Sequence, residues 1–209
     1  MKRILNLLFS IACSLMIITG AVKFTVEFKE LYYWDIRNLN ISKITNMTED
    51  ELKLNYDYLI DYNTSSSEDE FELPTLYSSP EGKIHFEEVR NIFQNVDKLL
   101  YITLIISLMG IYMNIKNRNL EFLKSVGNML IVIPLILTLP IVFNFEGSFV
   151  IFHKLLFKND YWIFDPNLDP VINMLPEQFF FHCGMLILLI ILVASGSMLM
   201  TYKLLKNKE

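Results

Sequence analysis

Four long apolar stretches without a charged residue constrain this chain more than any other feature of its sequence. They cover residues 4–22, 99–115, 126–143 and 179–200, and none contains Lys, Arg, Asp or Glu. A helix needs about 17–25 apolar residues to cross a hydrocarbon core of roughly 30 Å, whereas buried helices of soluble proteins have shorter apolar runs. The sequence therefore predicts an all-α membrane protein with four transmembrane helices.

Basic residues near the ends of these stretches set the expected orientation. The N-terminal segment, residues 116–125 and the C-terminal segment together carry eight basic and two acidic residues, a net charge of +6. Short segments rich in Lys and Arg remain in the cytoplasm, so we expect both termini inside, an N-in/C-in topology. The outer segments, residues 23–98 and 144–178, hold ten basic and twenty-one acidic residues, a net charge of −11. This charge argues against nucleic acid as a partner.

The first stretch also has features of a cleavable signal peptide. Lys2 and Arg3 form a basic start, and residues 19–21 (Thr-Gly-Ala) resemble a small-residue cleavage site. The apolar run is longer than the roughly 7–15 residues of a typical signal peptide, so a retained span is the favoured interpretation. We therefore treat residues 1–209 as a single membrane domain.

The first outer segment is predicted to be mainly helical. Thr48 and Glu51 have the spacing of a capping box, and apolar residues recur with a helical period after them. This pattern predicts a helix over about residues 49–62. Residues 24–28 alternate apolar and polar side chains, so they form either a short strand or the end of the first helix. Residues 80–82, Pro-Glu-Gly, are interpreted as a turn.

The second outer segment is short and apolar. Residues 149–157 are almost entirely apolar, which predicts a re-entrant or interfacial segment resting on the membrane. Asp169 followed by Pro170 is the pairing expected at an N-cap and a first helical position. A short helix over residues 171–175 is therefore predicted.

Histidine is the residue type best suited to acid–base chemistry, because its ordinary pKa of about 6.5 lies near neutrality. His85 lies where an apolar helical pattern begins that continues into the second stretch, and His153 lies in the apolar outer segment. Each is a candidate catalytic residue, and a shared site would require their rings to lie within about 10 Å of each other. His182, at the outer end of the fourth stretch, is assigned a structural role.

Other catalytic templates are absent from the sequence, which has no nucleophile elbow, no phosphate-binding glycine loop and no His-Glu-x-x-His pattern. A zinc site made by the three histidines is a competing interpretation, but their spacings of 68 and 29 residues match no local metal-binding pattern. We therefore expect no metal or other cofactor. A non-enzymatic alternative stays open, namely a four-span accessory or sensory subunit whose acidic outer domain binds a partner protein.

Two outer segments carry a distinctive pattern of residues. The first is residues 85–90, His-Phe-Glu-Glu-Val-Arg, directly before a predicted span, and the second runs from Phe152 to Trp162 and is followed by Asp165-Pro166. These segments resemble the bacterial lipoprotein intramolecular transacylase family, called Lit, and the resemblance extends over nearly the whole chain. Glu88 stands where the resemblance leads us to expect an aspartate.

The resemblance implies an enzyme that moves the sn-2 acyl chain of a diacylglyceryl-modified lipoprotein onto the α-amino group of the same N-terminal cysteine, giving the lyso form. It implies His85 and His153 as the catalytic pair, on the extracytoplasmic face of a bacterial cell membrane. A histidine suits this reaction, because an α-amino group has a pKa of about 7.7–8.0 and needs a base. Six further residues are assigned to substrate binding or to orienting the histidines: Glu88, Arg90, Lys154, Asn159, Asp160 and Trp162.

Overall fold

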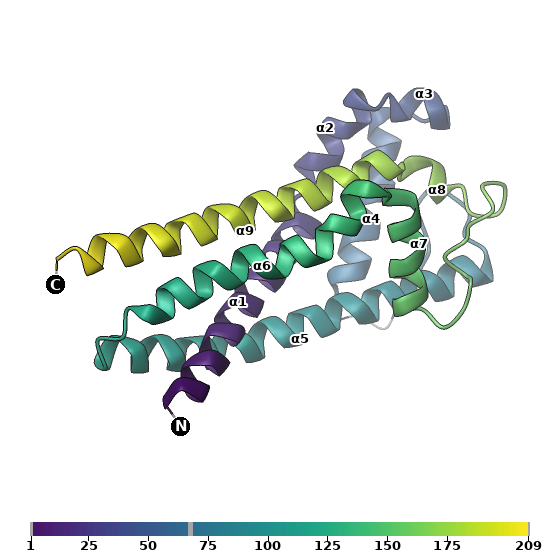
Figure 1. Cartoon of the computed structure of the whole chain (residues 1–209). Helices are drawn as coiled ribbons and strands as arrows, with labels where there is room; N and C mark the ends of the chain where they lie inside the picture. Colours follow the sequence, from purple (N-terminus) through teal and green to yellow (C-terminus); the bar gives the residue numbers. More distant parts are fainter. Residues whose placement is uncertain (1, 67–68, 209) are drawn as a thin grey trace. The chain divides into compact units, whose positions relative to one another are not determined.

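The computed structural model describes residues 2–66 and 69–208, apart from the side chains of residues 2, 137 and 140–142, and this part of the chain contains helices and no strand (Figure 1). The helices in chain order are α1 (Lys2–Glu27), α2 (Glu30–Asn38), α3 (Ile41–Thr45), α4 (Glu49–Thr64), α5 (Pro80–Lys116), α6 (Glu121–Phe143), α7 (Phe145–Leu156), α8 (Val171–Met174) and α9 (Glu177–Lys206). The chain folds as two compact units. Unit 1 comprises Met1–Phe24, Val96–Phe143 and Met185–Glu209, and unit 2 comprises Thr25–Asn95 and Asn144–Gly184.

Unit 1 contains most of the long apolar stretches, and its helices approach closely where side chains are small. A Cβ added at Gly110 would lie 2.7 Å from the Cβ of Phe9. Ser195 donates its hydroxyl to the carbonyl of Gly127 at 2.8 Å. Small residues and inter-helix hydrogen bonds are typical of helix packing in membranes, where lipid gives no hydrophobic driving force for association.

Three helices have the length and hydropathy to cross a membrane when the described residues are searched: Arg3–Glu27, Pro80–Lys116 and Glu177–Lys206. They contain three of the four predicted spans. The predicted span 126–143 lies in α6, but residues 137 and 140–142 of it fall outside the described side chains. The span at residues 126–143 and the N-in/C-in topology therefore stay predictions.

Unit 2 has an aromatic core of its own. The capping box of Thr48 and Glu51 begins α4, as predicted, and α4 buries Tyr56 against Tyr32 of α2, with ring centres 3.9 Å apart. Tyr32 also donates its hydroxyl to the carbonyl of Met174 at 2.9 Å. The second outer segment is thereby joined to the first through a buried hydrogen bond.

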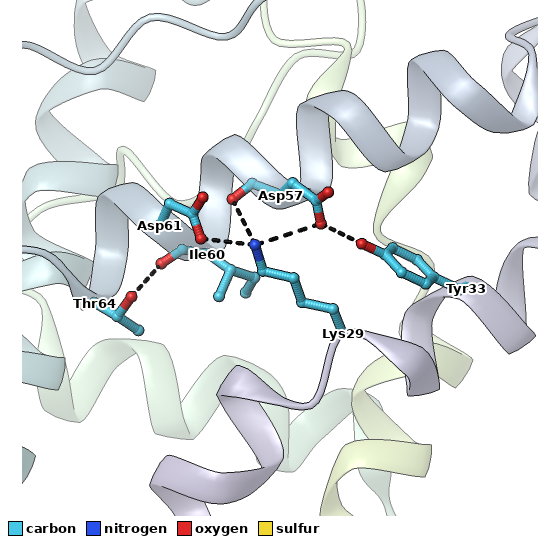
Figure 2. Close-up of polar contacts among 6 residues, drawn as sticks. All are labelled: Lys29, Tyr33, Asp57, Ile60, Asp61 and Thr64. Carbon is cyan, nitrogen blue, oxygen red and sulfur yellow. Dashed lines mark hydrogen bonds and ion pairs between the residues drawn. The ribbon is translucent and has the colours of Figure 1, made fainter.

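Figure 2 shows how the start of α2 is attached to α4. The Lys29 ammonium lies 2.7 Å from the Asp61 carboxylate and 3.5 Å from that of Asp57. Tyr33 donates its hydroxyl to the same Asp57 carboxylate. Burial lowers the pKa of Lys29, but the two carboxylates outweigh that effect and raise the pKa. Lys29 is therefore charged at neutral pH, and it links the two helices.

Three local predictions are settled by these elements. Residues 24–27 are helical, so the alternation at residues 24–28 belongs to the end of α1 and the short strand is wrong. The turn at residues 80–82 is also wrong, because these residues form the first turn of α5. A proline is well suited to the first helical position, where its missing N–H is not needed. Asp169 does not cap α8 with its side chain, although the short helix itself is present.

The apolar second outer segment is more ordered than a loop. Its first part forms α7, whose N-cap Asn144 accepts a hydrogen bond from the N–H of Gly147 at 2.9 Å. No residue of α7 is fully buried, and Phe152 and Leu155 are 57% and 80% exposed. The membrane-resting position predicted for this segment stays a prediction.

Candidate active site

The rings of His85 and His153 lie side by side in unit 2. His85 comes from the second turn of α5 and His153 from the last turn of α7. Their ring centres are 6.3 Å apart and their planes are inclined by 30°. This separation is within the limit set for a shared site. It is too long for a hydrogen bond between the rings, but a substrate atom between them can contact both at roughly 3 Å.

Aromatic rings enclose the pair. Phe157 and Phe164 lie 4.7 Å and 5.3 Å from His85, measured between ring centres. Trp162 stacks on His153 at 4.8 Å. The surroundings therefore have a low polarity, which strengthens each electrostatic interaction within them.

Burial decides the charge of His85. This side chain is only 5% exposed. Burial, and secondarily the neighbouring His153, lower the pKa of His85 from its ordinary value to about 4. Its Nδ1 is covered and has no hydrogen-bond partner among the described residues. His85 is thus a neutral imidazole at pH 7 with an uncommitted polar atom.

A backbone carbonyl fixes the tautomer of His153. The Nδ1 of His153 lies 2.8 Å from the carbonyl oxygen of Phe149, one helical turn earlier. A carbonyl can only accept, so Nδ1 carries the proton and the lone pair of the neutral ring is on Nε2. Burial lowers the pKa of His153, and the hydrogen bond to Phe149 opposes this effect by raising it.

Two more polar atoms of the site are covered without a partner in the described structure, namely the Oε2 of Glu88 and the indole Nε1 of Trp162. The other oxygen of Glu88 accepts a hydrogen bond from Asn159 at 2.9 Å. The glutamate at this position, where an aspartate was expected, thus reaches Asn159 and connects α5 to the loop that carries Trp162 through this hydrogen bond. More than about 90% of buried polar groups have a partner in native proteins, so these two atoms are candidates for contact with a substrate.

Asp169 fixes the start of the helix that carries His85, a role that local sequence patterns did not reveal. The carboxylate of Asp169 accepts from the Ser79 backbone N–H at 2.8 Å and from the Ser79 hydroxyl at 2.6 Å. The Ser79 oxygen in turn accepts from the Gly82 N–H at 2.9 Å. Ser79 is therefore the N-cap of α5. Gly82 is required there, since an added Cβ would lie 2.2 Å from Asp169 Oδ1.

The structure brings only some of the predicted site residues to the histidines. Arg90 is buried under the Tyr62 ring, 4.4 Å from its centre, and donates to the Asp69 carbonyl at 3.1 Å. Lys154 and Asp160 are exposed, and neither has a recorded contact with an imidazole. These positions favour packing by Arg90, while roles for the three in substrate binding stay predictions.

A carboxylate contacts the imidazole of His182. Such a contact had been expected instead at His85 or His153, from Glu88 or Asp160. The Nδ1 of His182 lies 2.8 Å and 2.9 Å from the two carboxylate oxygens of Asp35, which is fully buried. The structural role assigned to His182 agrees with this contact. Within the described ranges, no three His, Cys, Asp or Glu side chains are grouped as metal ligands.

The chain is similar to known proteins in both sequence and structure. The sequence profile of the lipoprotein intramolecular transacylase Lit matches residues 7–180. A solved structure of the membrane-integral lipoprotein intramolecular transacylase Lit from Bacillus cereus is 43% identical, with a TM-score of 0.95 over 100% of this chain and 97% of that one.

Two further structures are of the same Bacillus cereus protein with one histidine replaced, by arginine or by alanine. Both are 43% identical and have TM-scores of 0.91 over 100% of this chain, with 93% and 94% of the other chain covered. A search of curated proteins found no match. The chain therefore belongs to the lipoprotein intramolecular transacylase family, Lit, and is a membrane-integral enzyme of that family.

Proposed function

We propose that this enzyme moves the sn-2 acyl group of an S-diacylglyceryl-cysteine lipoprotein to the α-amino group of the same cysteine. The product is the lyso form, with an N-acyl chain and a monoacylglyceryl group. The observation that carries the proposal is the 6.3 Å separation of His85 and His153 inside an aromatic enclosure. In support, two of the related structures carry a replaced histidine.

The reaction needs proton movement and no external reactant. The amine nitrogen attacks the ester carbonyl carbon, a C–N bond forms, and the C–O bond to the glyceryl group breaks. One amine proton leaves the nitrogen and one proton reaches the departing glyceryl oxygen. An α-amino group that enters as an ammonium ion first releases one additional proton. Two histidines on either side of the reacting carbon supply both transfers.

His153 is assigned as the base. Its Nδ1–H is held by the Phe149 carbonyl at 2.8 Å, which leaves Nε2 as the proton acceptor. The same hydrogen bond stabilises the imidazolium that forms when Nε2 takes the amine proton. His153 is half-buried whereas His85 is fully buried, so charging His153 costs less than charging His85.

His85 is assigned to the leaving oxygen. Its low pKa of about 4 keeps the ring neutral at pH 7, and a neutral imidazole donates one N–H and accepts at its other nitrogen. A neutral histidine can act as a hydrogen-bond donor to developing negative charge, as in other enzymes. His85 thus donates its N–H to the glyceryl oxygen as the C–O bond breaks, while its other nitrogen accepts the proton that His153 took from the amine, so the His85 ring remains neutral.

Holding both reacting groups in one substrate molecule supplies much of the catalysis. Correct orientation of two such groups lowers a barrier by up to roughly 7–11 kcal/mol. The aromatic rings around the histidines offer apolar surface for an acyl chain and exclude water that would hydrolyse the ester. A four-span chain with this site on the extracytoplasmic face of the membrane would meet the lipid-modified end of its substrate there.

Expression in a bacterium that makes diacyl lipoproteins tests the proposal. An N-terminal lipopeptide is isolated from cells with and without the chain and is fragmented in a mass spectrometer. The diacyl and lyso forms have the same mass, so the fragments must locate the acyl chain. We expect it on the amine when the chain is present. A free amine in cells that contain the folded protein would contradict the proposal.

A further inference from the structure

We propose that Trp162 and Glu88 provide the two fixed polar contacts for the reacting groups of the substrate. The indole N–H of Trp162 donates to the ester carbonyl oxygen, and the free oxygen of Glu88 accepts from the α-ammonium group. This inference rests on the proposed transacylation, and it adds to the histidine pair an oxyanion donor and a recognition group for the free N-terminus.

The first observation is that the fold leaves these atoms unused. The Nε1 of Trp162 and the Oε2 of Glu88 are covered and have no partner among the described residues. Indole nitrogen can only donate, and carboxylate oxygen can only accept. Leaving such a group buried and unpaired lowers stability, whereas a substrate oxygen or ammonium would satisfy it. The substrate supplies one acceptor, its ester carbonyl, and one strong donor group, its ammonium.

The second observation concerns where the indole is held. Trp162 stacks on the His153 ring, with centres 4.8 Å apart and planes inclined by 30°. The stack fixes the indole plane beside the nitrogen that takes the amine proton. A donor placed next to the base lies close to the carbon that the amine attacks, which is where the carbonyl oxygen gains negative charge. Because Nε1 is covered, the side chains over it must move for the carbonyl to reach this donor.

The third observation concerns how Glu88 is aimed. It lies three residues after His85, so both side chains share one face of α5. Asn159 holds Oε1 at 2.9 Å, and this fixes the direction of the carboxylate and leaves Oε2 for another donor. Asn159 also lies three residues before Trp162 on the same loop. One loop therefore positions both the carboxylate and the indole.

An ammonium ion is the donor that suits Glu88 best. Hydrogen bonds between ionised groups are about twice as strong as those between neutral groups. A diacyl lipoprotein carries a free α-ammonium at its cysteine, whereas an N-acylated cysteine has a neutral amide. Glu88 thus selects the substrate that still has its amine, and it holds the nitrogen near His153 until the proton is removed.

Trp162→Phe tests the donor, because phenylalanine retains an aromatic ring and removes only the indole N–H and part of the ring. The chain provides a matched control in its one other tryptophan, Trp34, which is 55% exposed and contacts His182 instead. We expect kcat on a synthetic diacylglyceryl lipopeptide to fall roughly 10²–10³-fold for Trp162→Phe with little change in KM. Trp34→Phe should remain within about twofold of wild type.

Glu88→Gln tests the acceptor, since glutamine keeps the oxygen that Asn159 contacts and loses the charge. The neighbouring exposed Glu87 gives the control Glu87→Gln. Wild type and Glu87→Gln should bind a free-amine lipopeptide more tightly than its N-acetylated form. Glu88→Gln should lose that preference by roughly ten- to a hundredfold, because a hydrogen bond to a charged group is lost.

All proteins are compared in the same detergent after their melting temperatures are measured, so that misfolded variants are recognised. This inference alone would be overturned if wild type is active, Trp162→Phe retains the wild-type kcat and Glu88→Gln retains the preference for the free amine. A folded wild type that forms no N-acyl product would overturn both this inference and the proposed function. Loss in the two site variants, with both controls active, supports the inference.

Discussion

The carboxylate of Asp169 accepts two hydrogen bonds from Ser79, a residue 90 positions earlier, at 2.8 Å and 2.6 Å. This contact links the second outer segment to Ser79, the N-cap of α5. The same helix carries His85 and Glu88 in its next turns. The segment that holds His153 and the helix that holds His85 are therefore joined at a point outside the histidine pair.

Gly82→Ala should separate these two segments without touching a histidine. The added Cβ would lie 2.2 Å from Asp169 Oδ1, so the carboxylate must move and the hydrogen bonds to Ser79 must lengthen. We expect a destabilisation of about 1–3 kcal/mol and a lower kcat, since misplacement of about 1 Å can cost roughly 10²-fold in rate. Thermal unfolding in detergent and the lipopeptide assay measure the two effects.

Gly184→Ala is the control for this change. Apart from its chain neighbours and the backbone of its own helix, no described atom lies within 4 Å of a Cβ added at Gly184. Alanine favours a helix over glycine by up to about 1 kcal/mol, so this variant should be as stable as wild type or more so. Equal stability and activity of Gly82→Ala and Gly184→Ala would show that the Asp169–Ser79 contact does not position the site.

Acid should destabilise the protein through His85. Its folded-state pKa is about 4, against about 6.5 for an unperturbed histidine. Between these values the unfolded chain binds more protons than the folded protein, so stability is complete above about pH 6.5 and falls as the pH drops towards 4. The full shift corresponds to a loss on the order of 3 kcal/mol.

His85→Gln removes this titration, so its melting temperature should decline less between pH 7 and pH 4.5 than that of wild type. Carboxylates and His153 titrate in both proteins, so the difference between the two curves isolates His85. Parallel curves would mean that His85 is not held neutral by burial.

The Asp35–His182 pair should matter for stability and not for chemistry. Asp35 is fully buried and its carboxylate lies 2.8 Å from the His182 Nδ1. Removing His182 leaves the buried Asp35 carboxylate without this partner, and an unsatisfied buried group costs roughly 1–3 kcal/mol. We expect His182→Ala to unfold at a markedly lower temperature, while the protein that remains folded retains most of its kcat. A double variant, Asp35→Ala with His182→Ala, should lose less stability than the sum of the two single losses.

Local patterns in the sequence predict the elements of this fold well. The length of the apolar stretches accounts for the membrane helices that the structure supports, and the Thr48–Glu51 spacing predicts the start of α4. These predictions depend on residues a few positions apart, where helix geometry relates spacing directly to structure. The identification of His85 and His153 as neighbours came from family resemblance and not from local pattern.

Contacts between distant residues could not be predicted in this way. Residues 80–82 look like a turn because proline and glycine together usually indicate one, yet here proline begins α5 and glycine gives space to Asp169. Asp169 precedes a proline and so resembles an N-cap, but its side chain bonds Ser79 instead. Asp35 lies in an aromatic run and pairs with His182 across 147 positions. No local periodicity relates such pairs.

Transfer of the acyl chain by His85 and His153 acting together is tested most directly with purified proteins. Purified wild-type, His85→Ala and His153→Ala proteins are each given a synthetic diacylglyceryl lipopeptide with a free amine, and fragment ions report the position of the acyl chain over time. We expect N-acyl product from wild type and rates lower by at least roughly 10²–10⁴-fold for each variant, the usual contribution of a general acid or base. Folded variants that form product at the wild-type rate would contradict joint catalysis by the two histidines.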